Sequence, residues 1–204
     1  MANVLYINSS VRNSGSLSRQ QSAAFIAQWQ AAHPADTVVT RDLTTSPVPH
    51  LTEQMMGAFF TPAEARNADQ AHTIKTSDTL VDELIAADVV VIAAPMYNFS
   101  VPSTLKAWID HVARVGRTFK YGANGPEGQL AGKKVYVFTA SGGVYSEGPA
   151  AAYDFLTTYL STVLGFLGMT DVTYVRAEGV AMGEEAVANT IAKSNSKIAA
   201  LIAA

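Results

Sequence analysis

The stretch VVVIAAPMYNFSVPSTLKAWID, residues 89–110, decides the fold of this chain. Its apolar run, residues 89–94, stops at Pro95, and polar and aromatic residues follow at 96–99. A helical pattern of apolar residues then begins near Ser103. This order predicts a buried parallel strand, a loop at its carboxyl end and a helix that packs back on the sheet. Ligands of open α/β sheets bind beside such strand ends, and an aromatic-amide loop there favours a flat heteroaromatic ligand.

The rest of the chain repeats this alternation of strand and helix. Strands are predicted at residues 4–7, 36–40, 88–94, 134–140 and 172–175. Helices are predicted at residues 18–32, 63–87, 103–115, 150–167 and 184–203. Residues 43–61 and 117–132 are expected to be long irregular connections, which are often functional. We therefore expect an α/β fold with a doubly wound five-stranded parallel sheet of order 2-1-3-4-5, in three α/β/α layers, formed by residues 1–204 as a single domain.

Composition excludes several classes of protein. The 204 residues are 49% hydrophobic and 15% charged, which predicts a packed core rather than disorder. A net charge of −3 offers no basic surface, so nucleic acid is not an expected partner. The absence of cysteine excludes disulfides and thiol catalysis, and the four histidines lack metal-ligand spacing, so no metal is expected. Neither a secretory signal nor a membrane span is recognisable, which predicts a cytoplasmic protein with no membrane partner.

The first predicted loop, SSVRNSGSLSRQ at residues 9–20, combines five serines with the start of a helix. Free N–H groups at a helix start and serine hydroxyls suit a phosphate, and Gly15 permits close backbone approach. Arg12 or Arg19 could add positive charge. The alternative is that Ser18 merely caps the helix. Because both the dinucleotide fingerprint and the Walker A pattern are missing, the expected ligand is a monophosphate.

The other two candidate loops follow the third and fourth predicted strands. In residues 95–100, Tyr97 or Phe99 can cover the face of a ring, unless these side chains belong to the core. In TASGGVYSEG, residues 139–148, Gly142 and Gly143 can present consecutive N–H groups to an electron-rich edge, unless they form an ordinary turn. In the order 2-1-3-4-5 the three loops lie side by side, so one mononucleotide can span them.

The motifs VLYINSS, PMYNFSVPSTLKAWID, RTFKYGANGPEG and TASGG follow one another along nearly the whole chain. In this arrangement the chain resembles the FMN-dependent NADH azoreductases and NADH:quinone oxidoreductases, which have the flavodoxin-like fold. The resemblance implies that the FMN phosphate binds at Ser10, Ser16, Leu17 and Ser18. It also implies that the isoalloxazine ring lies against Met96, Tyr97, Asn98 and Phe99, with Ala140, Ser141, Gly142 and Gly143 at its pyrimidine edge.

The resemblance also implies an activity and an assembly. Flavin N5 would take a hydride from NAD(P)H and pass electrons to quinones or aromatic azo compounds in a ping-pong reaction, with no catalytic side chain. The family forms homodimers, so Phe119 and Tyr121 would reach the partner's flavin, and Phe60, with the neighbouring Phe59, would wall the substrate space. The alternative is that these aromatic residues fold onto their own core. The rival functions are a flavodoxin-type electron carrier and a non-catalytic regulator.

Overall fold

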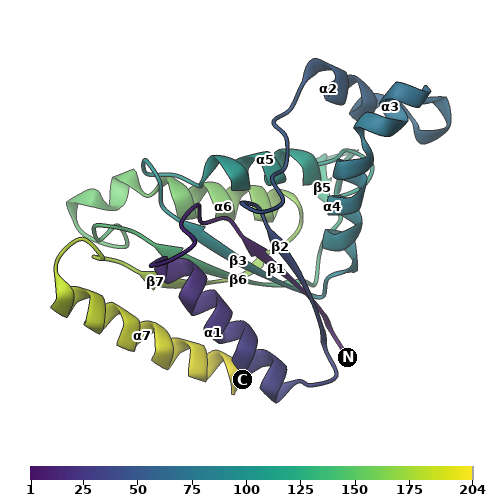
Figure 1. The fold of residues 1–204 in the computed structure, drawn as a ribbon. Helices are drawn as coiled ribbons and strands as arrows, with labels where there is room; N and C mark the ends of the chain where they lie inside the picture. Colours follow the sequence, from purple (N-terminus) through teal and green to yellow (C-terminus); the bar gives the residue numbers. More distant parts are fainter. Residues whose placement is uncertain (204) are drawn as a thin grey trace.

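A five-stranded parallel sheet forms the centre of the computed structural model, which describes residues 1–203 (Figure 1). Its strands are β1 (Asn3–Asn8), β2 (Thr37–Asp42), β3 (Val89–Pro95), β6 (Lys134–Ala140) and β7 (Asp171–Ala177). They are all parallel and lie in the order β2-β1-β3-β6-β7. The predicted order 2-1-3-4-5 is therefore confirmed. Ala204, the last residue of the predicted domain, lies outside the described residues.

Helices cover both faces of the sheet. α1 (Leu17–Ala32) and α7 (Glu184–Ile202) lie on one face, and α4 (Lys75–Ala86), α5 (Ser103–Val112) and α6 (Phe155–Phe166) lie on the other (Figure 1). None of the helices within residues 1–203 combines the length and the apolar character needed to cross a membrane. The sheet with its two helical layers is the expected three-layer arrangement.

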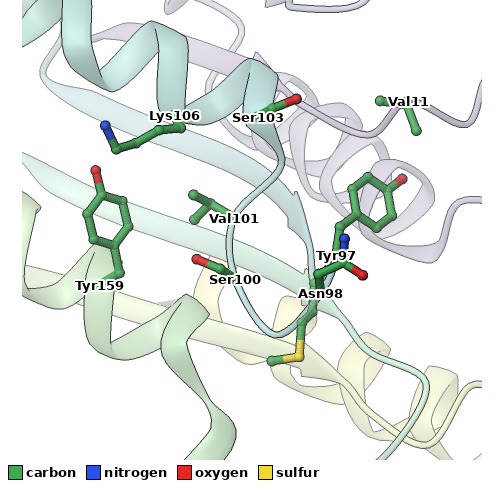
Figure 2. A pocket seen from close by; sticks show the side chains of 9 residues that line it. Val11, Tyr97, Asn98, Ser100, Val101, Ser103, Lys106 and Tyr159 are labelled. Carbon is green, nitrogen blue, oxygen red and sulfur yellow. The ribbon is translucent and has the colours of Figure 1, made fainter.

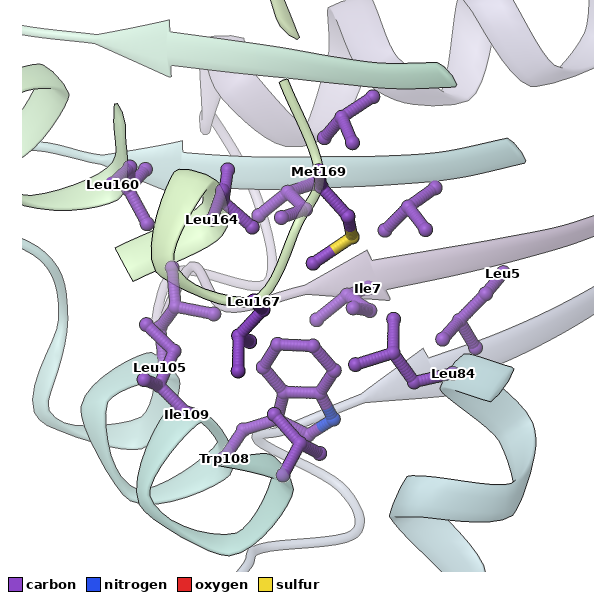
Figure 3. Close-up of a cluster of buried hydrophobic side chains, with 14 of the residues drawn as sticks. Leu5, Ile7, Leu84, Leu105, Trp108, Ile109, Leu160, Leu164, Leu167 and Met169 are labelled. Atoms are coloured by element: carbon purple, nitrogen blue, oxygen red, sulfur yellow. The ribbon is translucent and has the colours of Figure 1, made fainter. Parts of the chain in front are cut away.

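The two faces of the sheet bury two separate hydrophobic clusters. In β1, Val4 packs with Phe25 of α1, whereas Leu5 points to the opposite cluster around Trp108 of α5. Figure 3 shows Trp108 beside Leu167, in the cluster that also contains Leu84 and Met169. Because neighbouring residues of a strand face opposite sides, the alternate residues of β1 reach different clusters. β3 is buried along its whole length, as expected for a central strand of a parallel sheet.

Two of the predicted helices are divided into shorter pieces, because side chains cap new helix starts within them. The predicted helix 63–87 is three pieces, η1 (Ala63–Ala65), α3 (Ala68–Thr73) and α4. α3 begins with a capping box, in which Asn67 and Gln70 each accept the other's backbone N–H. The predicted helix 150–167 is a turn of 3₁₀ helix, η2 (Pro149–Tyr153), followed by α6, whose N-cap Asp154 accepts the Thr157 N–H. The helix predicted at 103–115 ends at Val112.

The two segments expected to be irregular contain regular structure. Residues 43–61 include α2 (Glu53–Phe60), which is capped by Thr52 and lies beyond the sheet together with α3 (Figure 1). Residues 117–132 include the antiparallel hairpin of β4 (Phe119–Gly122) and β5 (Gly125–Gly128). At Gly128 a Cβ atom would lie 2.2 Å from the backbone of Leu167 and Gly168, so only glycine allows the hairpin to pack there.

Candidate functional site

The three predicted loops meet at the carboxyl ends of β1, β3 and β6, where they line one cleft of about 470 Å³. We call this the loop cleft. Eight of the residues predicted to bind a cofactor line it: Ser10, Ser16, Leu17, Met96, Tyr97, Ala140, Ser141 and Gly142. Ser18, Asn98, Phe99 and Gly143 lie in the same loops but outside this lining. The adjacency inferred from strand order therefore holds in three dimensions.

One end of the loop cleft is the start of α1. Ser16 is the N-cap, because its Oγ accepts the Arg19 N–H at 3.4 Å. The alternative that Ser18 caps this helix is wrong: Ser18 is buried, and its Oγ lies 3.3 Å from Ser16 Oγ. Within residues 1–203, no hydrogen bond uses the N–H groups of Leu17 or Ser18. The helix start therefore keeps two donors for an anion.

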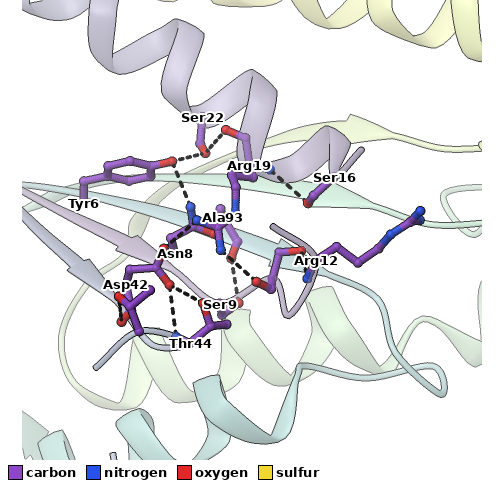
Figure 4. A network of polar contacts seen from close by, with 12 residues as sticks. Tyr6, Asn8, Ser9, Arg12, Ser16, Arg19, Ser22, Asp42, Thr44 and Ala93 are labelled. Carbon is purple, nitrogen blue, oxygen red and sulfur yellow. Dashed lines mark hydrogen bonds and ion pairs between the residues drawn. The ribbon is translucent and has the colours of Figure 1, made fainter. Parts of the chain in front are cut away.

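The two arginines of the first loop have different roles. Arg19 pairs with Asp42 at 2.5 Å and donates to the Ser10 carbonyl oxygen at 2.8 Å, which holds the loop from behind (Figure 4). Burial opposes the charged form of Asp42, but Arg19 and Thr44 outweigh it and lower the pKa of that carboxyl. Arg12 lines the loop cleft, and its side chain makes no polar contact with any other described residue. Arg12 is thus available to a ligand, whereas Arg19 is not.

A buried polar network supports the same loop. Tyr6 Oη lies 2.8 Å from Ser22 Oγ on α1 and accepts a 3.4 Å hydrogen bond from Asn8 Nδ2 (Figure 4). Burial raises the pKa of Tyr6, so its phenol stays neutral. Ser9 Oγ donates to the Ala93 carbonyl oxygen at 2.6 Å, and Ser10 Oγ lies 3.5 Å from Tyr97 Oη. These contacts fix the first loop against β3 and the second loop.

The second loop is a tight turn with an unfavourable backbone. Tyr97 and Ser100 exchange both N–H···O bonds, at 3.0 and 3.1 Å. Between them Asn98 has φ +49° and Phe99 has φ +69°. Two central residues with positive φ are typical of a type I′ turn, where asparagine is tolerated and glycine is preferred over a bulky residue. A phenylalanine in this conformation costs roughly 1–2 kcal/mol, and such strain is characteristic of functional positions.

A wider cavity of about 900 Å³ adjoins the loop cleft and shares Met96 and Tyr97 with it. Tyr97 and Asn98 stand on one side, and Lys106 and Tyr159 stand on the other (Figure 2). A hydrogen bond with Asp110 raises the pKa of Lys106, and burial raises the pKa of Tyr159. This cavity therefore offers one ammonium and one neutral phenol at neutral pH. Phe99 is 47% exposed, with its ring 5.8 Å from that of Tyr153.

The opposite end of the loop cleft is the third loop. The carbonyl oxygens of Ser141, Gly142 and Gly143 accept N–H groups from residues 179–181, at 3.0–3.1 Å. No hydrogen bond between described residues uses the N–H groups of Gly142 or Gly143. A Cβ on Gly142 would meet Ala181 Cβ at 3.5 Å, which is ordinary contact. The glycines thus turn their carbonyls away and leave donors free, as an anion-binding edge requires.

The aromatic residues predicted to wall a substrate pocket lie elsewhere. Phe60, Phe119 and Tyr121 line a third cavity of about 240 Å³, the aromatic cavity, which shares no lining residue with the loop cleft or the wide cavity. Phe60 is 69% exposed and Tyr121 is 73% exposed. The Phe119 ring lies 5.7 Å from that of Tyr121 and 4.6 Å from that of Phe166. Within one chain, these residues do not face the loops that carry the predicted cofactor contacts.

Buried His111 lies behind the aromatic cavity. Its ring contacts Phe59 edge-on at 6.0 Å, and its Nε2 lies 2.9 Å from the Pro49 carbonyl oxygen. Burial lowers the pKa of His111, so the imidazole is neutral. Its complete burial makes it a packing residue rather than an acid or base for a substrate.

Sequence reasoning missed the wall that β7 and α7 contribute to the loop cleft. Val180 follows β7, and Val187 and Ile191 lie on α7. The apolar periodicity of α7 is the pattern expected of any helix that packs on a sheet, so it does not mark Val187 and Ile191 as site residues.

Comparisons with known proteins agree with this geometry. A family model described as flavodoxin-like fold matches residues 2–202. An FMN-dependent NADH:quinone oxidoreductase from Herminiimonas arsenicoxydans is 58% identical over 204 residues, the full length of both chains. An FMN-dependent NADH:quinone oxidoreductase 2 from Pseudomonas fluorescens (strain Pf0-1) is 50% identical, over 97% of this chain and 98% of its own. A solved azoreductase from Bacillus anthracis str. Sterne has a TM-score of 0.92 at 31% identity, with 99% of each chain covered.

The fold and the site therefore define a flavodoxin-like protein with a cleft of about 470 Å³ at the carboxyl ends of its strands. The chain belongs to the flavodoxin-like family of FMN-dependent NADH:quinone oxidoreductases and azoreductases. The resemblance inferred from its sequence motifs is confirmed.

Proposed function

We propose that this chain is an oxidoreductase that binds FMN in the loop cleft, takes electrons from NADH and reduces quinones and aromatic azo compounds. The observation that carries the proposal is a cleft with free backbone donors at both ends. Leu17 and Ser18 supply N–H groups at the start of α1, and Gly142 and Gly143 supply them at the end of β6. The names of the relatives at 58% and 50% identity support the same cofactor and donor.

FMN fits this cleft in size and in chemistry. A volume of about 470 Å³ is within the ordinary range for small-molecule sites. The phosphate is held at the start of α1 by the N–H groups there, by the hydroxyls of Ser10, Ser16 and Ser18, and by the free guanidinium of Arg12. All of residues 1–204 serve as one FMN-binding domain, because the contacts come from both halves of the sheet.

The ring system is held by the second and third loops. Met96, Tyr97, Asn98 and Phe99 position it, with Ala140 and Ser141 beside it. Bound FMN supplies the redox chemistry, by accepting a hydride at N5 and returning two electrons to the second substrate. The free N–H groups of Gly142 and Gly143 stabilise negative charge at the pyrimidine edge, as donors in an oxyanion hole do.

The substrates use the wide cavity beside the loop cleft. Because this cavity shares Met96 and Tyr97 with the cofactor site, nicotinamide and the acceptor occupy one place in turn. Sequential use of one place predicts ping-pong kinetics, and water can supply the protons. NADH is the donor suggested by the relatives' names, and NADPH use stays a separate question for experiment.

We infer further that two copies of the chain act as a homodimer in the cytoplasm. Phe60 and Tyr121 are largely exposed around a cavity that lies apart from their own loop cleft. An exposed aromatic patch of this kind is typical of an interface. In the homodimer, Phe60, Phe119 and Tyr121 of one chain wall the substrate space beside the partner's FMN.

The test separates an enzyme from an electron carrier. Purified protein loaded with FMN is mixed with NADH without oxygen, and the flavin absorbance is followed. The proposal predicts that NADH bleaches the flavin and that menadione or methyl red then restores it, with parallel lines in double-reciprocal plots. Flavin that NADH does not bleach, in protein that binds FMN, would favour the flavodoxin-type carrier and exclude the reductase.

A further inference from the structure

The side chain of Glu178, which follows β7 directly, lies against the third loop rather than in solvent. Its Oε1 accepts the N–H groups of Tyr145 at 2.7 Å and Ser146 at 2.8 Å. Its Oε2 accepts the Ser146 hydroxyl at 2.5 Å. The Glu178 N–H donates to Thr190 Oγ1 at 3.0 Å, which ties this residue to α7. One carboxylate that is only 15% exposed therefore holds one end of the loop through three hydrogen bonds.

The backbone beside Glu178 holds the other end of the loop. Gly179, Val180 and Ala181 donate their N–H groups to the carbonyl oxygens of Gly143, Ser141 and Gly142, at 3.1, 3.1 and 3.0 Å. The Ser141 N–H donates to the Ala177 carbonyl oxygen at 2.9 Å. Residues 177–181 thus form hydrogen bonds with the third loop both before and after the two glycines.

These hydrogen bonds on both sides of the two glycines restrict the orientation of the glycine peptides. Glycine has unusual backbone freedom, so a Gly–Gly segment can turn its peptide planes unless other bonds prevent it. A turned plane would present a carbonyl oxygen to the loop cleft in place of an N–H group. The carboxylate of Glu178 fixes Tyr145 and Ser146, so the segment between them and β6 has little freedom to turn.

We propose that Glu178 is a positioning residue that keeps the Gly142 and Gly143 N–H groups directed at the cofactor and so sets the affinity and reduction potential of FMN. The inference rests on the proposed function, because it requires FMN in the loop cleft. Donors fixed in advance stabilise charge that develops on reduction, and they need no reorganisation. Glu178 lies outside the lining of the loop cleft and acts through the loop that it holds.

The negative charge of Glu178 shifts the reduction potential of FMN in the direction opposite to the shift caused by its positioning of the loop. A carboxylate near the cofactor disfavours the reduced, more negative form, so loss of the charge alone raises the reduction potential. Arg176 Nη1 lies 4.0 Å from Glu178 Oε1 and offsets part of that charge. Loss of positioning lowers the potential instead. The direction of the shift therefore separates the two effects.

The experiment compares Glu178→Ala with Glu178→Gln, in which one amide oxygen can still accept both backbone N–H groups. We expect Glu178→Ala to weaken FMN binding at least tenfold and to lower the preference for reduced over oxidised FMN by about tenfold, which is about 30 mV for a two-electron couple. Glu178→Gln should restore most of the affinity and should not lower the potential. Glu147→Ala is the matched control, because Glu147 is an exposed acid in the same loop.

Amide hydrogen exchange on the FMN-free protein gives a readout independent of activity. Residues 143–147 should exchange faster in Glu178→Ala than in the wild type and in Glu147→Ala, while the core strands keep their protection. The inference is overturned if Glu178→Ala binds FMN as the wild type does, or if both Glu178 variants raise the potential equally. If the wild type itself binds no FMN, the proposed function fails, and that outcome is distinct from either of these.

Discussion

The loop cleft and the aromatic cavity differ in how far their side chains are exposed to solvent. The loop cleft lies at the ends of β1, β3 and β6, and its Ser10 is fully buried. The aromatic cavity lies between α2, the end of α5 and strand β4, and its Tyr121 is 73% exposed. The first region has fixed hydrogen-bond donors, and the second has large apolar side chains open to solvent. This difference agrees with our proposal that one chain builds the cofactor site alone, whereas a second chain completes the substrate space.

The largest expected effect is on the phosphate end of the loop cleft. Replacing Ser10 and Ser16 together by alanine removes the two hydroxyls that we propose as donors to the charged phosphate, each worth roughly 1.5–3 kcal/mol. FMN affinity should fall at least a hundredfold, as measured by quenching of flavin fluorescence. Ser14→Ala, at an exposed serine of the same loop, is the control and should bind normally. Unchanged affinity in the double variant would show that the phosphate lies elsewhere.

The aromatic cavity should respond in the opposite manner. Tyr121→Ala should leave FMN affinity unchanged and lower kcat/KM for a quinone about three- to tenfold, since aromatic contacts contribute roughly 0.5–1.5 kcal/mol beyond their buried area. Phe155→Ala, at an exposed aromatic residue outside both sites, is the control. Weaker FMN binding with normal quinone kinetics would reverse the roles assigned to the two regions.

Mixed dimers test whether the aromatic residues of one chain serve the site of the other chain. A chain with Ser10→Ala and Ser16→Ala lacks FMN but keeps Tyr121, and a chain with Tyr121→Ala binds FMN but lacks the aromatic wall. If the wall serves the partner, co-refolding the two variants should create one intact site and raise activity above the average of the parents. Activity equal to that average would mean that each chain walls its own site.

In the turn at residues 97–100, a substitution that relieves backbone strain should preserve or raise stability and lower activity. Phe99 has φ +69°, so Phe99→Gly removes backbone strain while it also removes ring contacts with Tyr145 and Tyr153. We expect stability in urea to stay the same or to rise by up to about 1 kcal/mol, with kcat/KM reduced. A clear loss of stability would show that the ring contacts outweigh the strain.

The smallest expected effect concerns His111 behind the aromatic cavity. Burial lowers its pKa in the folded protein below that of the unfolded chain, so the unfolded chain binds the proton first as the pH falls. This histidine therefore contributes to a loss of stability as the pH falls through the unfolded pKa of about 6.5. His111→Gln should flatten that dependence in urea unfolding at a series of pH values, and His72→Gln at an exposed position should not. An equal slope in all three proteins would contradict this.

The doubly wound core could be predicted because its signals are local. Runs such as VVVIAA and KVYVFTA are apolar and rich in β-branched residues, so they indicate buried strands without tertiary information. Their alternation with helical patterns then limits the strand order. The three loops of the loop cleft followed from that order, and the structure brings them together.

The regular structure within residues 43–61 and 117–132, α2 and the β4–β5 hairpin, could not be predicted in the same way. α2 is only 8 residues long, and it is stabilised by a small cluster in which Phe59 and Ala58 pack against Ile74. A helix of that length depends on tertiary packing, which sequence periodicity does not contain. The hairpin did carry a signal, because Asn-Gly at residues 124–125 is a typical turn sequence. The turn itself consists of Ala123 and Asn124, since Gly125 already pairs with Gly122. The glycine-rich strands of the hairpin hid that signal, since glycine is unfavourable in most strands.

The most direct test of the central claim is to compare the affinities of the FMN-free protein for FMN and for riboflavin. We propose that the phosphate contacts lie at the start of α1, so FMN should bind at least a hundredfold more tightly than riboflavin, and the Ser10→Ala and Ser16→Ala double variant should lose most of that preference. Equal affinity for the two flavins, or a preference that survives in the double variant, would contradict the placement of the cofactor in the loop cleft.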